Sequence, residues 1–394
     1  MPSTPLGNRQ LIRAINRSII LNAIKANEAI ARADLARLTG LSAPTVTGIT
    51  AELIEAGLVF EKETGDSSGG RRPIRLAINP RGGFVIGIKV MEQHAIGTLA
   101  DLEASVLCKE IVHFESTEPG HIATALVVLV KALSTSMVIP SDKLLGVGVG
   151  LAGIVDNEKG VLRQSPFFGW HDVPFHDLLR QKLSVPVYID NDVNTFTLAE
   201  KWFGCGEGIA NFLCITVGRG VGMGIVANGQ FYRGKSGGAG EFGHIVVDPE
   251  GIPCHCGKRG CLETIVGETG LLCAARQLVP EFADLADVDQ LVALAEGGHP
   301  SAQKVLSGAG QTLGQEVANL VNIFNPELIL ISGEGVRYGI WFFEAVQGAI
   351  ARHAMSGLQQ DVTIRIEPWG DDVWARGAAS LVLRELFEHP THRA

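Results

Sequence analysis

The sequence predicts a two-part α/β protein, with an N-terminal winged helix-turn-helix and a larger, duplicated α/β body that has a central cleft. Three observations carry this prediction. The first 60 residues show a helix–turn–helix pattern, strand-length apolar runs alternate with helices in two sets after residue 84, and a cysteine-rich loop lies within the second set. The breaker cluster at 79–83 places the domain boundary, with a head at 1–80 and a body at 84–394.

Three helices are expected in the head. Apolar residues recur at helical spacing across 8–26, and a short helix follows at 31–40. Ser42 is the expected N-cap of the third helix, with Pro44 in the first turn, where proline is tolerated. That helix ends at Gly57. The tight turn between the second and third helices predicts a helix-turn-helix.

A β-hairpin wing is expected after the third helix. Strands at 58–60 and 74–78 flank a Gly/Ser tip that ends in Arg71 and Arg72, which are placed to enter a minor groove or contact phosphates. The helix face expected to meet the major groove consists of Ser42, Pro44, Thr45, Thr47 and Thr50. The helix has no Lys or Arg, so the strong bidentate contact to guanine is missing there. A bundle that binds a protein or caps the body is the alternative.

Charge is distributed unevenly along the chain. Residues 1–81 hold 11 Lys/Arg and 7 Asp/Glu, a net charge of +4, which leaves −13 for the rest of a chain whose total is −9. A basic head on an acidic body favours a contact with nucleic acid that is confined to the head. The four arginines Arg9, Arg13, Arg32 and Arg37 are either phosphate contacts or solvated charges.

The body repeats one arrangement of strands and helices. Two runs of strands are each followed by a helix and a further buried strand, and this repetition predicts the duplicated α/β architecture. The expected strands are 84–90, 94–99, 106–114, 144–150, 185–189, 212–217, 222–227 and 328–332, and the expected helices are 121–138, 175–182, 195–203 and 313–324.

The cysteine-rich loop predicts a metal site. Cys254, Cys256 and Cys261 are spaced C-x-C-x4-C, and His244 lies ten residues upstream. A His/Cys3 set is the ligand set of a closed tetrahedral zinc site, so the predicted Zn2+ is structural, in a loop at 244–261. The alternative is a cluster of reduced cysteines that act as small apolar residues.

The composition indicates the cellular compartment in which the protein is expected. No run of about 18 apolar residues exists, so no membrane span is expected, and the polar N-terminus lacks the apolar region of a signal peptide. Seven cysteines, three of them assigned to metal, fit a reducing cytoplasm better than a disulfide scaffold.

From end to end the chain resembles the ROK family of repressors, open reading frames and sugar kinases. The motifs are RADLARLTGLSAPTVTGITAELIEAGLV and GGRRP in the head, and DNDVN, GEFGH and CHCGKRGCLE in the body. The resemblance implies an actin/hexokinase-like (ribonuclease H-like) body with a sugar-binding cleft.

The resemblance also implies roles for particular residues. Asp192 matches the general base of ROK sugar kinases, and residues of the same motifs hydrogen-bond the sugar there. The matching positions are Asn191, Glu241, His244 and Glu263. His244 would have one ring nitrogen on zinc and the other toward a sugar hydroxyl. From the residues alone, Asp192 is equally well explained as a helix N-cap.

The phosphate-binding loops of the kinase members are altered. Met91, Glu92 and Gln93 stand where the first loop has its glycine–threonine turn, Arg219 replaces a threonine in the second loop, and Glu334 interrupts the third. These changes argue against phosphoryl transfer, so that Asp192 is a vestigial base and no catalytic residue is predicted. Phe167, in SPFFGW, occupies the place of a sugar-contacting asparagine.

The expected function is therefore that of a cytoplasmic, DNA-binding transcriptional regulator, most simply a repressor of carbohydrate genes. Its partners would be a double-stranded DNA operator and a sugar-like effector whose binding closes the cleft and repositions paired heads. Palindromic operators call for a homodimer or homotetramer. Two alternatives are an ATP-dependent sugar kinase with an appended DNA-binding domain, and a regulator controlled by a transport-system protein.

Overall fold

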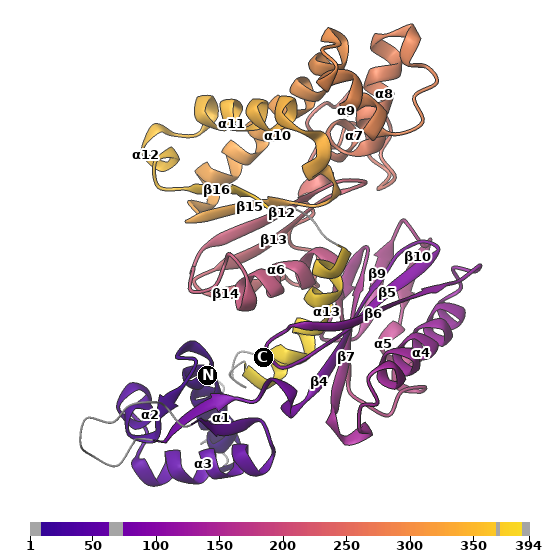
Figure 1. Cartoon of the computed structure of the whole chain (residues 1–394). Helices are drawn as coiled ribbons and strands as arrows, with labels where there is room; N and C mark the ends of the chain where they lie inside the picture. Colours follow the sequence, from indigo (N-terminus) through magenta and orange to yellow (C-terminus); the bar gives the residue numbers. More distant parts are fainter. Residues whose placement is uncertain (1–8, 63–73, 368–370, 388–394) are drawn as a thin grey trace, which may run out of the picture. The chain divides into compact units, whose positions relative to one another are not determined.

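The computed structural model describes residues 9–62, 74–367 and 371–387 (Figure 1). The chain forms two compact units. Unit 1 contains residues 1–150, 175–189 and 378–394, and unit 2 contains residues 151–174 and 190–377. The expected wing tip with Arg71 and Arg72 lies outside the described residues.

The head, in unit 1, consists of three helices and a small sheet. Its elements are α1 (Arg9–Ala26), β1 (Ile30–Ala31), α2 (Arg32–Thr39), α3 (Ala43–Glu55), β2 (Val59–Lys62) and β3 (Arg75–Ile78), with strand order β1-β3-β2. Ser42 caps α3 as expected, because its side chain accepts a hydrogen bond from the backbone N–H of Thr45 at 3.3 Å. Ile24, Leu35 and Leu53 are fully buried and form the core of the three helices.

The body part of unit 1 is built on a five-stranded sheet. Its strands are β4 (Phe84–Val90), β5 (His94–Ala100), β6 (Val106–His113), β7 (Leu144–Leu151) and β11 (Val187–Asn191), in the order β11-β7-β4-β5-β6. The pairs β4–β5 and β5–β6 are antiparallel, whereas β4 and β7 are parallel.

Helix α4 (Pro119–Ser136) packs on this sheet, and Gly97 of β5 makes room for it. A Cβ added at Gly97 would lie 2.9 Å from side-chain carbons of Leu129 and Leu133. By length and composition, α4 is also the one helix among the described residues that could cross a membrane. It packs on β5 and β6, and its buried residues include Leu126, Leu129 and Leu133.

Unit 2 repeats the same sheet. Its strands are β12 (Phe212–Val217), β13 (Val221–Ala227), β14 (Gln230–Tyr232), β15 (Leu328–Ser332) and β16 (Thr363–Ile366), in the order β14-β13-β12-β15-β16. β12 and β13 form an antiparallel hairpin, and β12 pairs with β15 in parallel. The two sheets share one topology, β4 matching β12 and β7 matching β15, so the predicted duplication is confirmed.

Alternation along β13 separates the layers of unit 2. Gly222 and Gly224 face α6 (Asp192–Phe203) closely, since a Cβ on Gly224 would lie 1.9 Å from Thr197 Oγ1. Met223 and Ile225 point the other way, into the core with α10 (Pro300–Phe324) and α11 (Ile340–His353).

The remaining elements, like β1, β14, β16 and α11 above, were not predicted. They are β8 (Ile154–Asp156), β9 (Val161–Ser165) and β10 (Trp170–Val173), which form a separate sheet, the helices α7 (Glu263–Val266), α8 (Glu268–Leu278), α9 (Val288–Glu296), α12 (Ser356–Gln359) and α13 (Asp371–Phe387), and the 3-10 turns at 80–82, 141–143, 280–282 and 334–338. The expected helix 175–182 is α5 (Phe175–Arg180).

Candidate functional site

The predicted metal ligands converge in unit 2. His244 ends a 3-10 turn (Phe242–His244), and two isolated bridges, Val246 with Cys261 and Pro253 with Arg259, fold the following loop back on itself. Gly260 makes the close approach, because a Cβ there would lie 1.4 Å from the carbonyl oxygen of Asp248.

The ligand atoms fit a tetrahedral metal ion. Zinc–sulfur bonds of about 2.3 Å place sulfur atoms roughly 3.8 Å apart, with sulfur–nitrogen edges of about 3.5 Å. Cys256 Sγ lies 3.6 Å from Cys261 Sγ, and Cys254 Sγ lies 3.5 Å from His244 Nδ1. All four ligand atoms lie within 4.8 Å of one another. The donor set and its spacing therefore suit a closed metal site.

His244 links this cluster to a carboxylate. Its Nδ1 faces the cysteines, while its Nε2 lies 3.9 Å from Glu241 Oε2. Burial, followed by the charges of His255 and Lys258, lowers the pKa of His244 to about 4, so the imidazole is neutral at physiological pH. A neutral ring is the form that binds a metal.

Glu263 follows the last cysteine and begins α7. Its Oε2 accepts a hydrogen bond from the backbone N–H of Val221 at 3.0 Å, and its Oε1 lies 3.2 Å from His255 Nδ1. Burial raises the pKa of Glu263 to about 7, against the opposing effect of the Val221 N–H. His255 was not among the predicted site residues, although its place between Cys254 and Cys256 was a usable signal.

The carboxylates of the site influence one another. Burial, then the nearby charges of Asp192 and Glu263, raises the pKa of Glu241. Asp192, Glu241 and Glu263 thus form one acidic group beside the metal ligands. Carboxylates and imidazoles in such a group can bind the hydroxyls of a polyol.

Asn191, not Asp192, caps the helix that begins at this site. Asn191 Oδ1 accepts the N–H of Asn194 at 3.1 Å, and its Nδ2 donates to the carbonyl oxygen of Gly153 at 2.9 Å. Asp192 is the first residue of α6, so its alternative interpretation as an N-cap is wrong. The Asn191 amide is already bonded to protein groups at both ends, and its oxygen keeps one further acceptor site.

An ion pair that the sequence did not indicate lies directly before Asn191. Asp190 is fully buried, and Arg233 donates to it from both Nε and Nη2, at 2.9 and 2.8 Å. The Arg233 guanidinium lies over the Phe231 ring, 4.4 Å from its centroid. This pair fixes the start of the glycine-rich segment 234–240, which leads to Glu241.

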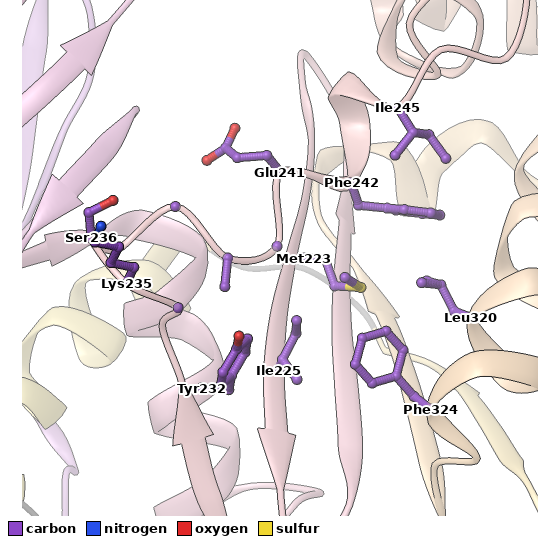
Figure 2. A pocket seen from close by; sticks show the side chains of 14 residues that line it. Met223, Ile225, Tyr232, Lys235, Ser236, Glu241, Phe242, Ile245, Leu320 and Phe324 are labelled. Carbon is purple, nitrogen blue, oxygen red and sulfur yellow. The ribbon is translucent and has the colours of Figure 1, made fainter.

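Beside that segment lies a pocket of about 520 Å3, which both polar and apolar residues line (Figure 2). Its walls include Met223 and Ile225 of β13 and Leu320 and Phe324 of α10. Figure 2 shows the Glu241 carboxylate pointing away from these apolar side chains. Glu241 lines this pocket and belongs to the acidic group, so the pocket adjoins that group.

The helix α3 of the head presents a small, uncharged face. Ser42, Pro44 and Thr47 are exposed, and Thr45 is half-buried, its hydroxyl 2.8 Å from that of Ser42. The prediction for Thr50 is wrong. Thr50 is fully buried, and its hydroxyl donates to the carbonyl oxygen of Thr47 and accepts from Arg32 Nε. It belongs to the core stripe that also contains Val46, four residues earlier.

Three of the four arginines considered as phosphate contacts pair with acidic side chains. The pairs are Arg13 with Glu52, Arg32 with Glu61, and Arg37 with Asp34. Arg9 is exposed at the start of α1. The positive charge of the head is thus partly compensated within the head itself.

Comparison with known proteins assigns a family model to each part of the chain. Residues 85–385 match the ROK family model, and residues 14–72 match a MarR family model. The xylose repressor of Caldicellulosiruptor bescii is 31% identical over 400 residues, covering 98% of this chain and all of the relative. The transcriptional dual regulator NagC of Escherichia coli is 30% identical and covers 97% of this chain and 95% of its own length.

Solved structures agree with this match. A ROK family transcriptional regulator, a homolog of the E. coli MLC protein, superposes with a TM-score of 0.86 at 26% identity, covering 96% of this chain and 97% of that one. A ROK glucokinase from Streptomyces griseus, bound to glucose and AMPPNP, covers 76% of this chain and 99% of its own at a TM-score of 0.66 and 27% identity. A ROK body of residues 85–385 behind a MarR-type head thus accounts for nearly the whole chain, which is a member of the ROK family.

Proposed function

We propose that this protein is a transcriptional repressor of carbohydrate genes. The head binds a double-stranded DNA operator, and a sugar-like effector bound at the acidic group controls that binding. The effector contacts in this proposal are Asn191, Asp192, Glu241, His244 and Glu263, and the DNA contacts are Ser42, Pro44, Thr45, Thr47, Arg71 and Arg72.

One observation carries the proposal. A helix-turn-helix and a carboxylate–imidazole group occur in a single chain, and relatives that match over 97–98% of this chain are named as a xylose repressor and a transcriptional regulator. An effector shifts DNA binding only if its affinity differs between the DNA-bound and free states. A ligand that joins Glu241 to Glu263 contacts two segments of unit 2 and can supply that difference.

The metal in this proposal is a structural Zn2+ held by His244, Cys254, Cys256 and Cys261. When bound, zinc would tie His244 to the three cysteines and so fix the fold of the loop between them. His244 then keeps a defined orientation beside Glu241, and Glu263 stays on the N–H of Val221. The metal contributes to effector binding by holding these side chains in place.

Phosphoryl transfer is absent from the proposed function. A Cβ on Gly218 would lie 2.3 Å from Glu334 Oε2, so a carboxylate already stands against the glycine loop between β12 and β13. The turn from Val90 to His94 contains no glycine and includes Glu92. Both carboxylates repel a triphosphate. The competing kinase function predicts ADP formation from Mg-ATP and a sugar, lost in Asp192→Asn.

The proposed protein works in the cytoplasm as a homodimer or homotetramer, because two-fold operators need paired heads. Sedimentation velocity measures the oligomeric state. A monomer at concentrations that saturate the operator would exclude paired binding. A transport-system protein as the controlling partner is the second candidate for the signal.

Fluorescence anisotropy on the chain's own upstream promoter tests the proposal, at about 0.1–0.15 M salt and with a panel of sugars. Tight binding that one sugar relieves is the expected result. Tight binding that no sugar changes would replace the sugar with a protein partner. An absence of specific binding would overturn the repressor function.

A further inference from the structure

The turn between β9 and β10 presents one aromatic ring outward and one inward. Trp170 of β10 pairs with Ser165 of β9, so four residues form the turn. Phe168 is 7% exposed and packs on Trp170, with ring centroids 4.8 Å apart. Phe167 is 38% exposed. The hairpin thus anchors itself with Phe168 and leaves the Phe167 ring accessible.

The Phe167 ring lies against the zinc loop. Its centroid is 5.6 Å from that of His255, and the guanidinium carbon of Arg219 lies 5.9 Å from the same centroid. These distances are within the range of aromatic and cation–π contacts. Two neighbours from different loops therefore hold the ring in position.

His255 connects this ring to the effector residues. Its Nδ1 lies 3.2 Å from Glu263 Oε1, and its ring meets that of His244 edge-on, 5.1 Å between centroids. Phe167 and His255, here called the aromatic wall, therefore border the carboxylates. A ligand that contacts Glu263 would therefore also meet this wall.

We propose that the aromatic wall determines which sugars act as effectors. It selects a sugar that presents carbon-bound hydrogen or an apolar substituent, and not a hydroxyl, toward Phe167. Pentoses, deoxy sugars and sugars with apolar substituents are the ligand class. This inference rests on the proposed function and adds the specificity of its effector site.

The physical reason is the unequal treatment of a hydroxyl and a C–H group at a phenyl ring. A hydroxyl buried there loses hydrogen bonds to water and finds no acceptor in the ring, so its desolvation is not compensated. C–H groups gain dispersion contacts with the ring carbons. One such difference in a pocket is worth roughly 10–200-fold in affinity.

Isothermal titration of the full-length, zinc-loaded protein tests the inference with matched sugars. The pairs are xylose with glucose, each deoxyglucose with glucose, and phenyl glucoside with glucose. In at least one of these pairs, we expect the sugar that lacks a hydroxyl or carries an apolar group to bind about tenfold tighter than glucose, or tighter still. Phe167→Asn, which offers an amide instead of a ring, should reduce this ratio about tenfold.

Phe324→Asn is the matched control. Phe324 is 39% exposed, in the same unit, and lines the pocket shown in Figure 2, whose lining includes neither Phe167 nor His255. Its substitution should leave the affinity ratio unchanged. His255→Ala should weaken every sugar, and melting curves confirm that each variant is folded.

The outcomes separate the two claims. If sugars bind and release DNA but Phe167→Asn leaves the ratio at the wild-type value, the wall does not select the ligand, while the proposed function stands. If no sugar binds the wild-type protein or releases it from DNA, the sugar effector of the proposed function is wrong and this inference fails with it.

Discussion

Arg233 donates two hydrogen bonds to the same carboxylate oxygen of Asp190, at 2.9 and 2.8 Å. The other oxygen, Oδ1, accepts the N–H of Asn191 at 2.8 Å and Asn194 Nδ2 at 2.9 Å. One buried carboxylate thus organises the start of α6 and the glycine-rich segment that leads to Glu241.

Removal of Arg233 should therefore destabilise unit 2 and loosen the effector site. Arg233→Ala leaves a buried carboxylate without a counter-charge, a change that costs about 3–5 kcal/mol. Urea denaturation measures the loss. Arg37→Ala is the control, because Arg37 and Asp34 are an exposed pair worth about 0–1 kcal/mol. Equal effects of the two substitutions would show that the Asp190 pair has no special role.

Loss of a metal ligand should impair the effector response more than DNA binding. Cys256→Ser should release the zinc and weaken effector affinity about 10–100-fold, since His244 and Glu263 lose their fixed positions. Metal analysis and anisotropy with effector measure both. Cys273→Ser, a free cysteine on α8 of the same unit, should change neither. An unaltered response in zinc-free Cys256→Ser would count against a supporting role for the metal.

A negative charge on the exposed face of α3 should weaken operator binding. Thr47→Asp places a carboxylate where the DNA phosphates approach, and at least a tenfold loss at about 0.1 M salt is expected. Thr124→Asp on α4 is the matched control. Both threonines are exposed and donate to the carbonyl four residues earlier, at 2.9 and 2.8 Å. Anisotropy with operator DNA that shows equal affinities for both variants would place the DNA elsewhere.

Stability should fall with rising pH because of Glu200, which is 7% exposed on α6 and accepts the N–H of Cys205. Burial, with a contribution from Glu367, raises the pKa of Glu200, while the Cys205 N–H and Arg376 oppose the change. The folded state therefore binds the proton more tightly than the unfolded state. The resulting penalty grows as the pH passes the ordinary carboxyl value and then the raised one.

Glu200→Gln keeps an acceptor for the Cys205 N–H and removes the titration. Between about pH 4 and pH 8, the melting temperature of the variant should rise relative to that of the wild type as the pH rises. Glu55→Gln, on the exposed end of α3, should follow the wild type. Parallel curves for Glu200→Gln and the wild type would show that Glu200 does not titrate in this range.

The sequence predicted best where local pattern determines structure. The strand predicted at 84–90 has the same bounds as β4, because glycine and turn residues flank this apolar run. The metal ligands could be predicted equally well, since all four lie within 18 residues of the sequence. The sheet of β8, β9 and β10 was missed, because its short strands are only partly apolar.

Long-range partners account for most of what could not be predicted in the site. Asp190 and Arg233 are 43 residues apart, and no periodicity links them. Phe167 and His255 meet through two loops whose geometry depends on the whole of unit 2. Thr50 is different, because its spacing from Val46 and Leu53 already placed it on the buried stripe.

The last described helix is bonded to the first. Asn22 Nδ2 of α1 donates to the carbonyl oxygen of Phe387 at 2.5 Å, and Lys25 lies over the Phe387 ring. A ribosome makes α1 first and Phe387 some 365 residues later. The contact can therefore form only when synthesis of the chain is nearly complete. A chain that is truncated before Phe387 has a head without this contact.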